Sequence, residues 1–309
     1  MALDVRPIIP SRFFGHKSRG AAPSSRIGAY IALMKLRVVE LLLVTTVPTM
    51  VLAEGGWPSI QLVAITLIGG TLAAGGANAI NMYIDRDIDK LMVRTQNRPL
   101  VTGALTPRAA MIFAIALEIV AFLVLWAGAN LLAAVLAVSA TLFYVFVYSL
   151  WLKRTSKQNI VIGGAAGAMP VLVGWAAVTN SLGWAPVVLF IVIFLWTPPH
   201  FWALAIRHAD DYKAAGVPMM PVVVSLERTV RSMTTYAVLL TLSTLVLVPV
   251  AELGWIYGIT ALVFGVAFVI GSVRLGSDPS PKRSMRLFTF SITYVTAVFV
   301  ALTVDVLLR

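Results

Sequence analysis

Nine long apolar stretches constrain the fold of this chain more than any other feature. A helix needs about 20 apolar residues to cross the hydrocarbon core of a bilayer, where it satisfies its own backbone polar groups. Charged residues make up only 12% of the sequence, against about a quarter in soluble domains. We therefore predict an all-α polytopic membrane protein with nine transmembrane helices. The stretches run approximately over residues 28–53, 59–84, 107–127, 129–151, 159–179, 184–207, 229–251, 254–274 and 286–308.

Basic residues fall almost entirely on one side of these nine spans. They occupy the N-terminal segment and the loops after the second, fourth, sixth and eighth spans, whereas the opposite turns carry Glu54 and Glu252. Because cytoplasmic loops are enriched in Lys and Arg, we predict a cytoplasmic N-terminus and an external C-terminus. This distribution explains the net charge of +11 without nucleic acid as a partner. We expect residues 1–25 to be a disordered basic tail and residues 26–309 a single transmembrane domain in the cytoplasmic membrane.

An acidic cluster follows the second span, in a chain with only 13 acidic residues. Asn81, Asp85 and Asp89 are spaced i, i+4, i+8, so they share one face if the helix continues through them. Their oxygen atoms suit Mg²⁺, which usually binds through one or two carboxylates plus substrate phosphates. The alternative is that they are solvated loop residues. Cysteine is absent, which excludes thiolate metal ligands.

Two other acidic residues lie nearby or within a span. Asp87 is on the opposite face of the same helix, where it is placed to pair with Lys90 or Arg94. Glu118 stands alone in the middle of the third span. We assign no role to Asp87 or Glu118.

Basic side chains accompany carboxylates in two loops on the predicted cytoplasmic side. The first loop continues with Arg94 and Arg98, and the loop after the sixth span holds Asp210, Asp211 and Lys213. Carboxylates that hold Mg²⁺, beside Arg or Lys that neutralise charge, form the chemistry that binds a diphosphate. The alternative for the basic residues is the general enrichment of Lys and Arg in cytoplasmic loops.

Three polar residues stand at unusual positions in or beside spans. Lys153 ends the fourth span, either as a further cation for a diphosphate or as a snorkelling anchor. Asn159 opens a span rich in Gly and Ala, a composition that is typical of close helix packing or that leaves room for a bulky ligand. His200 follows two prolines that are expected to break the sixth span. It either satisfies freed backbone groups or faces a cavity as a proton-transfer group.

These motifs resemble those of the UbiA-type intramembrane prenyltransferases. The superfamily motif Asn-x₃-Asp-x₃-Asp matches Asn81, Asp85 and Asp89. Other segments resemble the branch that transfers a farnesyl group to haem, the haem O synthases. These segments are Lys35-Leu-Arg37, Leu152-Lys-Arg-Thr155 with Asn159, Thr197-Pro-Pro-His200-Phe-Trp202, and Asp210-Asp211-Tyr-x₃-Gly216.

The second acidic motif departs from the wider family pattern of Asp-x₃-Asp. Ile206 and Arg207 occupy the region of the earlier Asp, which leaves Asp210 and Asp211. The second half of the site is therefore expected to hold Mg²⁺ through fewer protein ligands, or to use Lys213.

The resemblance implies a bundle around a central cavity, Mg²⁺ as cofactor, and a site that opens toward the cytoplasm. It implies farnesyl diphosphate and haem B as substrates, within the lipid bilayer, and haem A synthase or oxidase assembly proteins as protein partners. The implied metal ligands are Asn81, Asp85, Asp89 and Asp211. The implied catalytic residues are Asp85, Asp89, Lys153 and His200. The implied diphosphate-side residues are Asn81, Arg94, Arg98, Asp210, Asp211 and Lys213, and the implied cavity residues are Arg37, Tyr148, Asn159 and Trp202.

Two other functions remain open at this level. One is a prenyltransferase of the same type that acts on an aromatic quinone precursor. The other is a transporter or assembly factor without catalysis, which has no use for a Mg²⁺-diphosphate site.

Overall fold

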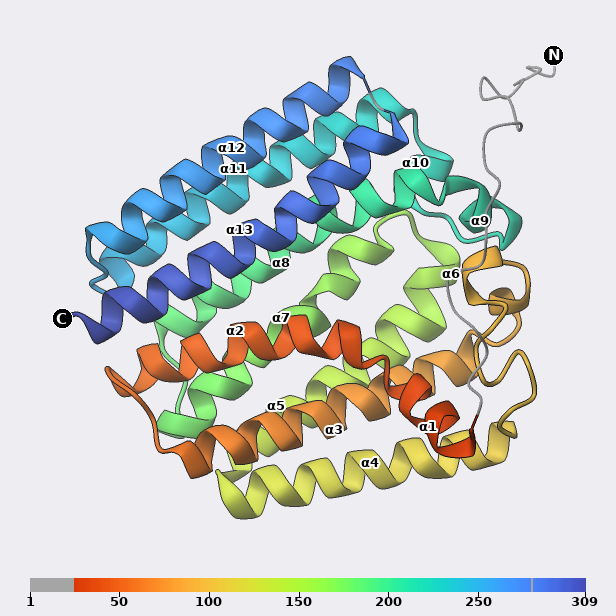
Figure 1. Ribbon diagram of the computed structural model, residues 1–309, viewed down its shortest axis with the longest axis horizontal. Coiled ribbons are helices and arrows are strands. Elements are labelled where there is room, and N and C mark those ends of the chain that lie inside the picture. The colour runs from red at the N-terminus through yellow and green to blue at the C-terminus, as the bar shows by residue number, and fades with distance from the viewer. Residues whose placement is uncertain (1–24, 279) are drawn as a thin grey trace.

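Long apolar helices make up most of the structure, a computed structural model that describes residues 25–278 and 280–309 (Figure 1). The predicted basic tail, apart from Ser25, lies outside these residues, and so does the side chain of Arg37. The helices are α1 (Arg26–Met34), α2 (Leu36–Glu54), α3 (Ile60–Ile84), α4 (Pro107–Gly128), α5 (Leu131–Leu142), α6 (Lys153–Thr155), α7 (Asn159–Thr179), α8 (Trp184–Arg207), α9 (Ala209–Ala214), α10 (Met220–Val223), α11 (Leu226–Val250), α12 (Trp255–Ser277) and α13 (Pro281–Leu307). Two short 3-10 turns, η1 (Ile88–Lys90) and η2 (Val93–Thr95), follow α3, and a π-helix, η3 (Phe143–Leu152), follows α5.

The predicted membrane character is confirmed by the lengths of these helices. In the described part of the chain, eight helical segments are long and apolar enough to cross a membrane. One of them, Leu131–Thr155, is formed by α5, η3 and α6 together. Helix α2, with 19 residues, covers most of the first predicted span. The count of nine and the orientation of the termini stay predictions.

Short polar side chains determine where several helices begin. Ser59, Thr106, Ser225 and Ser280 each precede a long helix, and each accepts a hydrogen bond from a backbone N–H of its first turn. Such caps satisfy donors that have no partner within the helix. The caps stand at the membrane ends of the apolar segments, so they fix where each span enters the bundle.

The first predicted span, 28–53, is wrong as one continuous helix. Lys35 adopts the left-handed conformation with φ 52°, so α1 ends there and α2 starts in a new direction. A lysine with positive φ is uncommon and needs support from its surroundings. Here its ammonium donates a hydrogen bond to Asn81 Oδ1 at 3.0 Å.

The expectation that the two prolines break the sixth span is also wrong. Helix α8 runs from Trp184 to Arg207 with Pro198 and Pro199 inside it. Neighbouring helices α7, α11 and α13 pack on α8, and both prolines are buried. Prolines are tolerated within membrane helices where neighbouring helices and Ser or Thr side chains compensate for the lost backbone bonds. Thr197 does so locally, since its hydroxyl donates to the Ile193 carbonyl at 2.9 Å.

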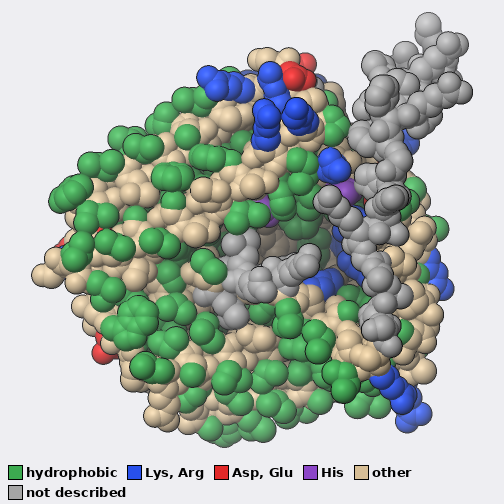
Figure 2. Space-filling model, in the orientation of Figure 1, with side chains coloured by type: hydrophobic (Ala, Val, Ile, Leu, Met, Phe, Trp, Pro, Cys, Tyr) green, Lys and Arg blue, Asp and Glu red, His purple; other side chains and the backbone are tan. Residues whose placement is uncertain are grey.

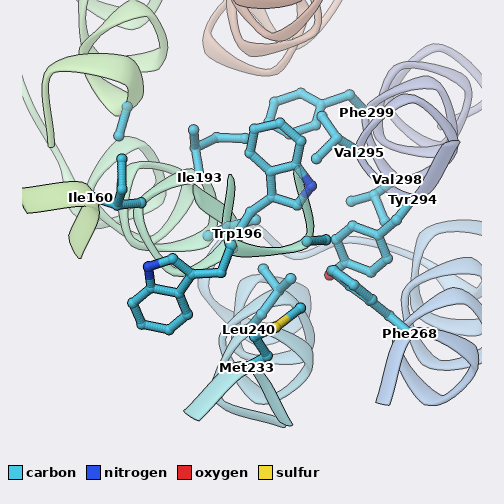
Figure 3. Close-up of a cluster of buried hydrophobic side chains, with 14 of the residues drawn as sticks. Ile160, Ile193, Trp196, Met233, Leu240, Phe268, Tyr294, Val295, Val298 and Phe299 are labelled. Carbon is cyan, nitrogen blue, oxygen red and sulfur yellow. The ribbon is translucent and has the colours of Figure 1, made fainter. Parts of the chain in front are cut away.

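The helices form two groups with α2 and α7 between them (Figure 1). Helices α3, α4 and α5 make one group, and α8, α11, α12 and α13 make the other. The largest apolar core lies in the second group, where Phe268, Tyr294 and Leu240 are fully buried (Figure 3). The short helices α6, α9 and α10 lie together at the end of the bundle opposite the C-terminus (Figure 1). Lys and Arg side chains line the upper and right-hand rim of the same view (Figure 2).

A carboxylate from α13 caps the start of α12. Asp305 accepts hydrogen bonds from the backbone N–H groups of Gly254 at 2.7 Å and Tyr257 at 3.0 Å. Gly254 itself has no side chain with which to cap the helix. Arg309 pairs with the same carboxylate at 3.1 Å, and Asp305 is 3% exposed. This contact ties the last helix to the preceding one.

We expect Asp305→Ala to lower the free energy of unfolding by about 1–3 kcal/mol, because two buried backbone donors lose their acceptor. The thermal unfolding midpoint of detergent-purified protein measures this loss. Asp278→Ala is the matched control, since Asp278 pairs with Arg283 at 3.0 Å on the surface, with about half of each side chain exposed. That change is expected to cost less than about 1 kcal/mol. Equal losses in the two variants would show that the cap adds nothing.

Candidate functional site

The Asn81, Asp85 and Asp89 series keeps helical spacing although the α-helix itself stops. Helix α3 ends at Ile84, and Asp89 belongs to the 3-10 turn η1. The backbone N–H of Asp85 still bonds to the Asn81 carbonyl at 2.9 Å, and that of Asp89 to the Asp85 carbonyl at 2.8 Å. Bonds between residues four apart keep the three side chains one above the other. All three are buried, with 2%, 0% and 0% of their surfaces exposed.

Asn81 connects three elements through its side-chain amide. Its Oδ1 accepts from Lys35 Nζ, while its Nδ2 donates to Asp85 Oδ2 at 2.9 Å and to Ser149 Oγ at 3.0 Å. Lys35 comes from the α1–α2 break and Ser149 from η3. A buried amide with several hydrogen bonds has a fixed orientation, so Asn81 holds the Asp85 carboxylate in place.

The π-helix η3 brings Lys153 to the same carboxylate. Lys153 Nζ donates to Asp85 Oδ2, with the lysine side chain 13% exposed and that of Asp85 fully buried. In a π-helix, residues five apart are hydrogen-bonded neighbours. Tyr148 and Lys153 are five apart, and the ammonium lies 5.9 Å from the centre of the Tyr148 ring. Ser149 is likewise tied to Tyr144, whose carbonyl accepts from the serine hydroxyl at 2.9 Å.

Asp89 is paired with Arg98 from the loop that follows. Arg98 Nη1 lies 2.5 Å from Asp89 Oδ2, and the arginine side chain is 21% exposed. Thr95 supports the turn, because its hydroxyl donates to the Asp89 carbonyl at 2.7 Å. The two buried carboxylates of the first motif are therefore each joined to a basic side chain.

Each of these carboxylates keeps one oxygen without a hydrogen bond. Within the described residues, Asp85 Oδ1, Asp89 Oδ1 and Asp211 Oδ2 are buried and accept no hydrogen bond. Buried acceptors are normally satisfied, and exceptions are typical of sites that bind an ion, a water molecule or a ligand. Unsatisfied carboxylate oxygens of this kind indicate that the acidic residues have capacity to bind a cation together with water or substrate.

The second acidic loop contacts the first through Asp211 and Tyr212. Asp211 Oδ1 accepts from the backbone N–H of Val93 at 3.2 Å, and its other oxygen lies 3.8 Å from His208 Nδ1. The Arg94 guanidinium lies 4.9 Å from the centre of the Tyr212 ring. Burial raises the pKa of the Tyr212 phenol, so a neutral ring faces the arginine. Asp211 and Arg94 are thus brought together, whereas Asp210 and Lys213 lie on the exposed face of α9.

The donor set suits Mg²⁺ better than a metal that needs a complete protein cage. In the described part of the chain, no three His, Asp or Glu side chains come close enough to enclose a metal ion on their own. Mg²⁺ keeps several water ligands and is usually held through one or two carboxylates and substrate phosphates. The oxygens of Asp85, Asp89 and Asp211 that accept no hydrogen bond fit that requirement.

Asp87 pairs with a residue that its position in the helix did not indicate. The pairings with Lys90 or Arg94 are wrong, because both Asp87 oxygens accept from the Arg154 guanidinium at 2.7 Å. These hydrogen bonds hold the pKa of the Asp87 carboxyl well below its usual range. The carboxyl is 60% exposed, so this pair lies at the surface while Lys153 and Asp85 are buried beside it. Helical spacing did not indicate this partner because Arg154 comes from α6, which is 67 residues away from Asp87 in the sequence.

A cavity of about 260 Å³ lies within the bundle. Tyr148, whose ring centre is 5.9 Å from the Lys153 ammonium, lines it together with Tyr144 and Asn78. The other lining residues come from α2, α3, α5, α7 and α8 and are mostly small or apolar. Tyr144 and Tyr148 stack with their ring centres 5.3 Å apart. Tyr148 thus links the buried acid–base cluster, here called the polar mouth, to an apolar chamber. Its role as a substrate-cavity residue, which the resemblance implied, stays a prediction.

Three residues of the predicted site lie apart from this cavity. His200 is stacked between Trp196 and Phe288, with ring centres 4.1 and 4.5 Å away, and its Nδ1 is 2.6 Å from Ser291 Oγ. Trp202 is 1% exposed in the apolar core. Asn159 is fully buried, and neither of its amide atoms has a partner in the described structure. None of the three lines the described cavity.

Sequence reasoning does not identify Lys35 or Ser149 as members of the site. Lys35 enters only as part of the segment Lys35-Leu-Arg37. Ser149 carried no signal, because a serine inside an apolar span usually bonds to its own helix. Its contact with Asn81 depends on the packing of η3 against α3.

Comparisons with known proteins identify the family of the chain and agree with its fold. The model of the UbiA prenyltransferase family matches residues 42–296 of the chain. A curated relative in Frankia casuarinae, called protoheme IX farnesyltransferase, is 54% identical over 290 residues, which are 92% of this chain and 99% of the relative. The chain is similar in fold to the solved structure of digeranylgeranylglyceryl phosphate synthase, with a TM-score of 0.76 at 18% identity over 92% of this chain and 99% of that one. It is also similar to a UbiA homolog from Archaeoglobus fulgidus bound to DMAPP and Mg²⁺, with a TM-score of 0.66 at 19% identity over 89% of this chain and 99% of that one.

Proposed function

Because the chain belongs to the UbiA prenyltransferase family, we propose that it transfers a farnesyl group from farnesyl diphosphate to a vinyl group of haem B, giving haem O. It is an integral polytopic membrane enzyme. The observation that carries the proposal is the buried pairing of Asp85 with Lys153 and of Asp89 with Arg98, beside Tyr148, which lines the apolar cavity. This arrangement suits a substrate with a diphosphate head and a hydrocarbon tail.

The residues that would hold Mg²⁺ are Asn81, Asp85, Asp89 and Asp211, of which the three carboxylates keep an oxygen that accepts no hydrogen bond. The ion supplies Lewis-acid chemistry when bound, which neutralises charge on the diphosphate. Asn81 and its hydrogen bonds to Lys35 and Ser149 fix the direction of the Asp85 carboxylate. The site is thereby ordered before the substrate arrives, which lowers the cost of reorganisation during the reaction.

Basic side chains stabilise the negative charge that develops on the diphosphate leaving group. The bond between C1 of the farnesyl chain and the diphosphate oxygen breaks, and the electron pair leaves with the oxygen. Lys153 and Arg98 lie beside the buried carboxylates, and Arg94 and Lys213 are proposed to contact the outer phosphate. Asp210, on the exposed face of α9, is proposed to contribute a further carboxylate on the diphosphate side of the site. The fixed positive charges of Lys153 and Arg98 stabilise the leaving group strongly because water is excluded around them.

The cavity protects the allylic cation that remains. Its walls are apolar, and the stacked rings of Tyr144 and Tyr148 present π-faces that stabilise positive charge. The vinyl group of haem B supplies the electron pair for the new carbon–carbon bond. Water then adds to the adjacent carbon and loses a proton, which gives the hydroxyethylfarnesyl group. The roles proposed for Arg37, Asn159, His200 and Trp202 are not needed for these steps.

We propose that the site opens toward the cytoplasm in the cytoplasmic membrane. The basic loops that support this orientation come from the same end of the bundle as Lys153 and Arg98. Mg²⁺ and farnesyl diphosphate are soluble in water and reach the site from that side. Haem A synthase or oxidase assembly proteins are the proposed partners for the product.

Product analysis with the purified protein tests this function. Incubation with farnesyl diphosphate, Mg²⁺ and haem B is expected to give a haem whose mass increases by one farnesyl group and one hydroxyl group. Chelation of Mg²⁺ is expected to stop the reaction. A prenylated 4-hydroxybenzoate in place of farnesylated haem would favour a quinone-precursor enzyme. If the unchanged protein transfers a prenyl group to neither acceptor, the result would favour a transporter or assembly factor.

A further inference from the structure

The cavity is built for an uncharged chain. Its lining, as far as the chain is described, contains no Lys, Arg or His side chain. Two of its threonines, Thr66 and Thr197, donate their hydroxyls to carbonyls of their own helices at 2.8 and 2.9 Å. A haem carries two propionates that need cationic or hydrogen-bonding partners when buried. An isoprenoid chain needs none, so the inner cavity fits the tail of the diphosphate substrate.

Gly167, one of the glycines in this lining, is not explained by contact with a neighbouring helix. A Cβ atom at Gly163 would lie 2.3 Å from the Tyr148 ring, and one at Gly164 would lie 3.0 Å from Thr197. These glycines allow close contact with η3 and α8. A Cβ atom at Gly167 would meet nothing within 4 Å, although Gly167 lines the cavity. Glycine is a poor helix former, so its presence in the middle of α7 costs stability without a packing benefit.

The depth of Gly167 matches the position of the last isoprene unit. Gly163 packs against the Tyr148 ring, whose centre is 5.9 Å from the Lys153 ammonium, and Gly167 lies four residues, or about 6 Å, further along α7. Gly167 is therefore about 12 Å from the ammonium along this path. Thr66, at the inner end, is fifteen residues from Asn81, or about 22 Å along α3. An extended chain advances about 1.2 Å per bond, so geranyl spans about 8 Å and farnesyl about 13 Å. A geranyl chain ends before Gly167, and a farnesyl chain passes it.

We propose that Gly167 determines the length of the isoprenoid chain that the enzyme accepts, because the absence of a side chain there leaves space for the third isoprene unit. This inference rests on the proposed prenyl transfer to haem B. It assigns Gly167 a function in substrate selection, separate from the chemistry at Asp85 and Lys153. Larger side chains at this position shorten the usable cavity while the polar mouth stays intact.

Competition between farnesyl and geranyl diphosphates tests the proposal, with haem B as acceptor and both products quantified by mass. Gly167→Leu is expected to lower the ratio of kcat/KM for farnesyl over geranyl at least tenfold relative to the unchanged protein, with Gly167→Ala between them. A few methylene groups in an apolar pocket discriminate by about this much or more. Gly258→Leu is the control, because Gly258 is a helical glycine of α12 outside the cavity, where an added Cβ would meet only Val248 at 3.8 Å. Its ratio is expected to stay unchanged.

The outcomes separate this inference from the function on which it rests. An unchanged ratio in Gly167→Leu, with a thermal midpoint like that of the unchanged protein, overturns the role of Gly167. A raised KM for haem B with the same ratio also overturns it, since that result places the acceptor at Gly167. Failure of the unchanged protein to transfer either chain to haem B rejects the proposed function instead.

Discussion

Asp85→Asn is expected to reduce farnesyl transfer about a thousandfold at saturating Mg²⁺, which corresponds to about 4 kcal/mol of transition-state stabilisation. Asp85 is fully buried, accepts hydrogen bonds from Lys153 and Asn81, and keeps one oxygen free. Asparagine has nearly the same shape but no negative charge, so it neither holds Mg²⁺ nor balances the buried ammonium. Single-turnover assays with haem B and farnesyl diphosphate measure the chemical step directly.

Asp87→Asn is the matched control for this change, since it removes the same charge two residues away. Asp87 is 60% exposed and pairs with Arg154 at the surface. Exposed ion pairs contribute little, so transfer is expected to fall less than about threefold. Full activity of Asp85→Asn under saturating Mg²⁺ would reject its assignment as a metal ligand. Equal losses in both variants would mean that only the fold had been disturbed.

Lys153→Met is expected to have the second largest effect, a loss of at least a hundredfold in kcat. Methionine keeps the unbranched apolar stem but removes the ammonium, which lies against Asp85 and 5.9 Å from the centre of the Tyr148 ring. Removal of one fixed donor from the charge that develops in a transition state typically costs about 10²–10³ in kcat. Steady-state kinetics at varied farnesyl diphosphate separates this effect on kcat from one on KM.

Arg154→Met provides the comparison, because it changes the neighbouring residue of the same short helix. Its guanidinium is 34% exposed and contacts Asp87 and the Ile84 carbonyl outside the buried cluster. We expect nearly normal kcat in this variant. A loss as large as that of Lys153→Met would mean that the basic residues of α6 act through general charge rather than through a specific contact.

The acidic motif was predictable from sequence because its geometry is local. The spacing of Asn81, Asp85 and Asp89 follows from one helical repeat, and backbone bonds preserve that repeat beyond the last residue of α3. Their buried partners Lys153 and Arg98 were also predictable, as basic residues on the same predicted side. The pairing of each base with its carboxylate was not, since it depends on how η3 and the loop after α3 fold against the acidic residues.

Other features depend on backbone conformations that have no short-range signature in this sequence. The left-handed turn at Lys35 and the π-helix around Tyr148 bring Lys35 and Ser149 to Asn81. The continuous α8 at Pro198 and Pro199 depends on burial by neighbouring helices. In each case the tertiary contacts of the bundle override what the local residues favour.

Equilibrium binding of farnesyl thiodiphosphate, an analogue that resists ionisation, tests most directly whether the buried acid–base cluster is a Mg²⁺-diphosphate site. Isothermal titration of the purified protein, with Mg²⁺ or with a chelator, isolates binding from chemistry. We expect Mg²⁺ to tighten binding at least tenfold in the unchanged protein and to have little effect in Asp85→Asn. Binding of equal strength with and without Mg²⁺ in both proteins would show that the carboxylates do not hold a metal for the diphosphate.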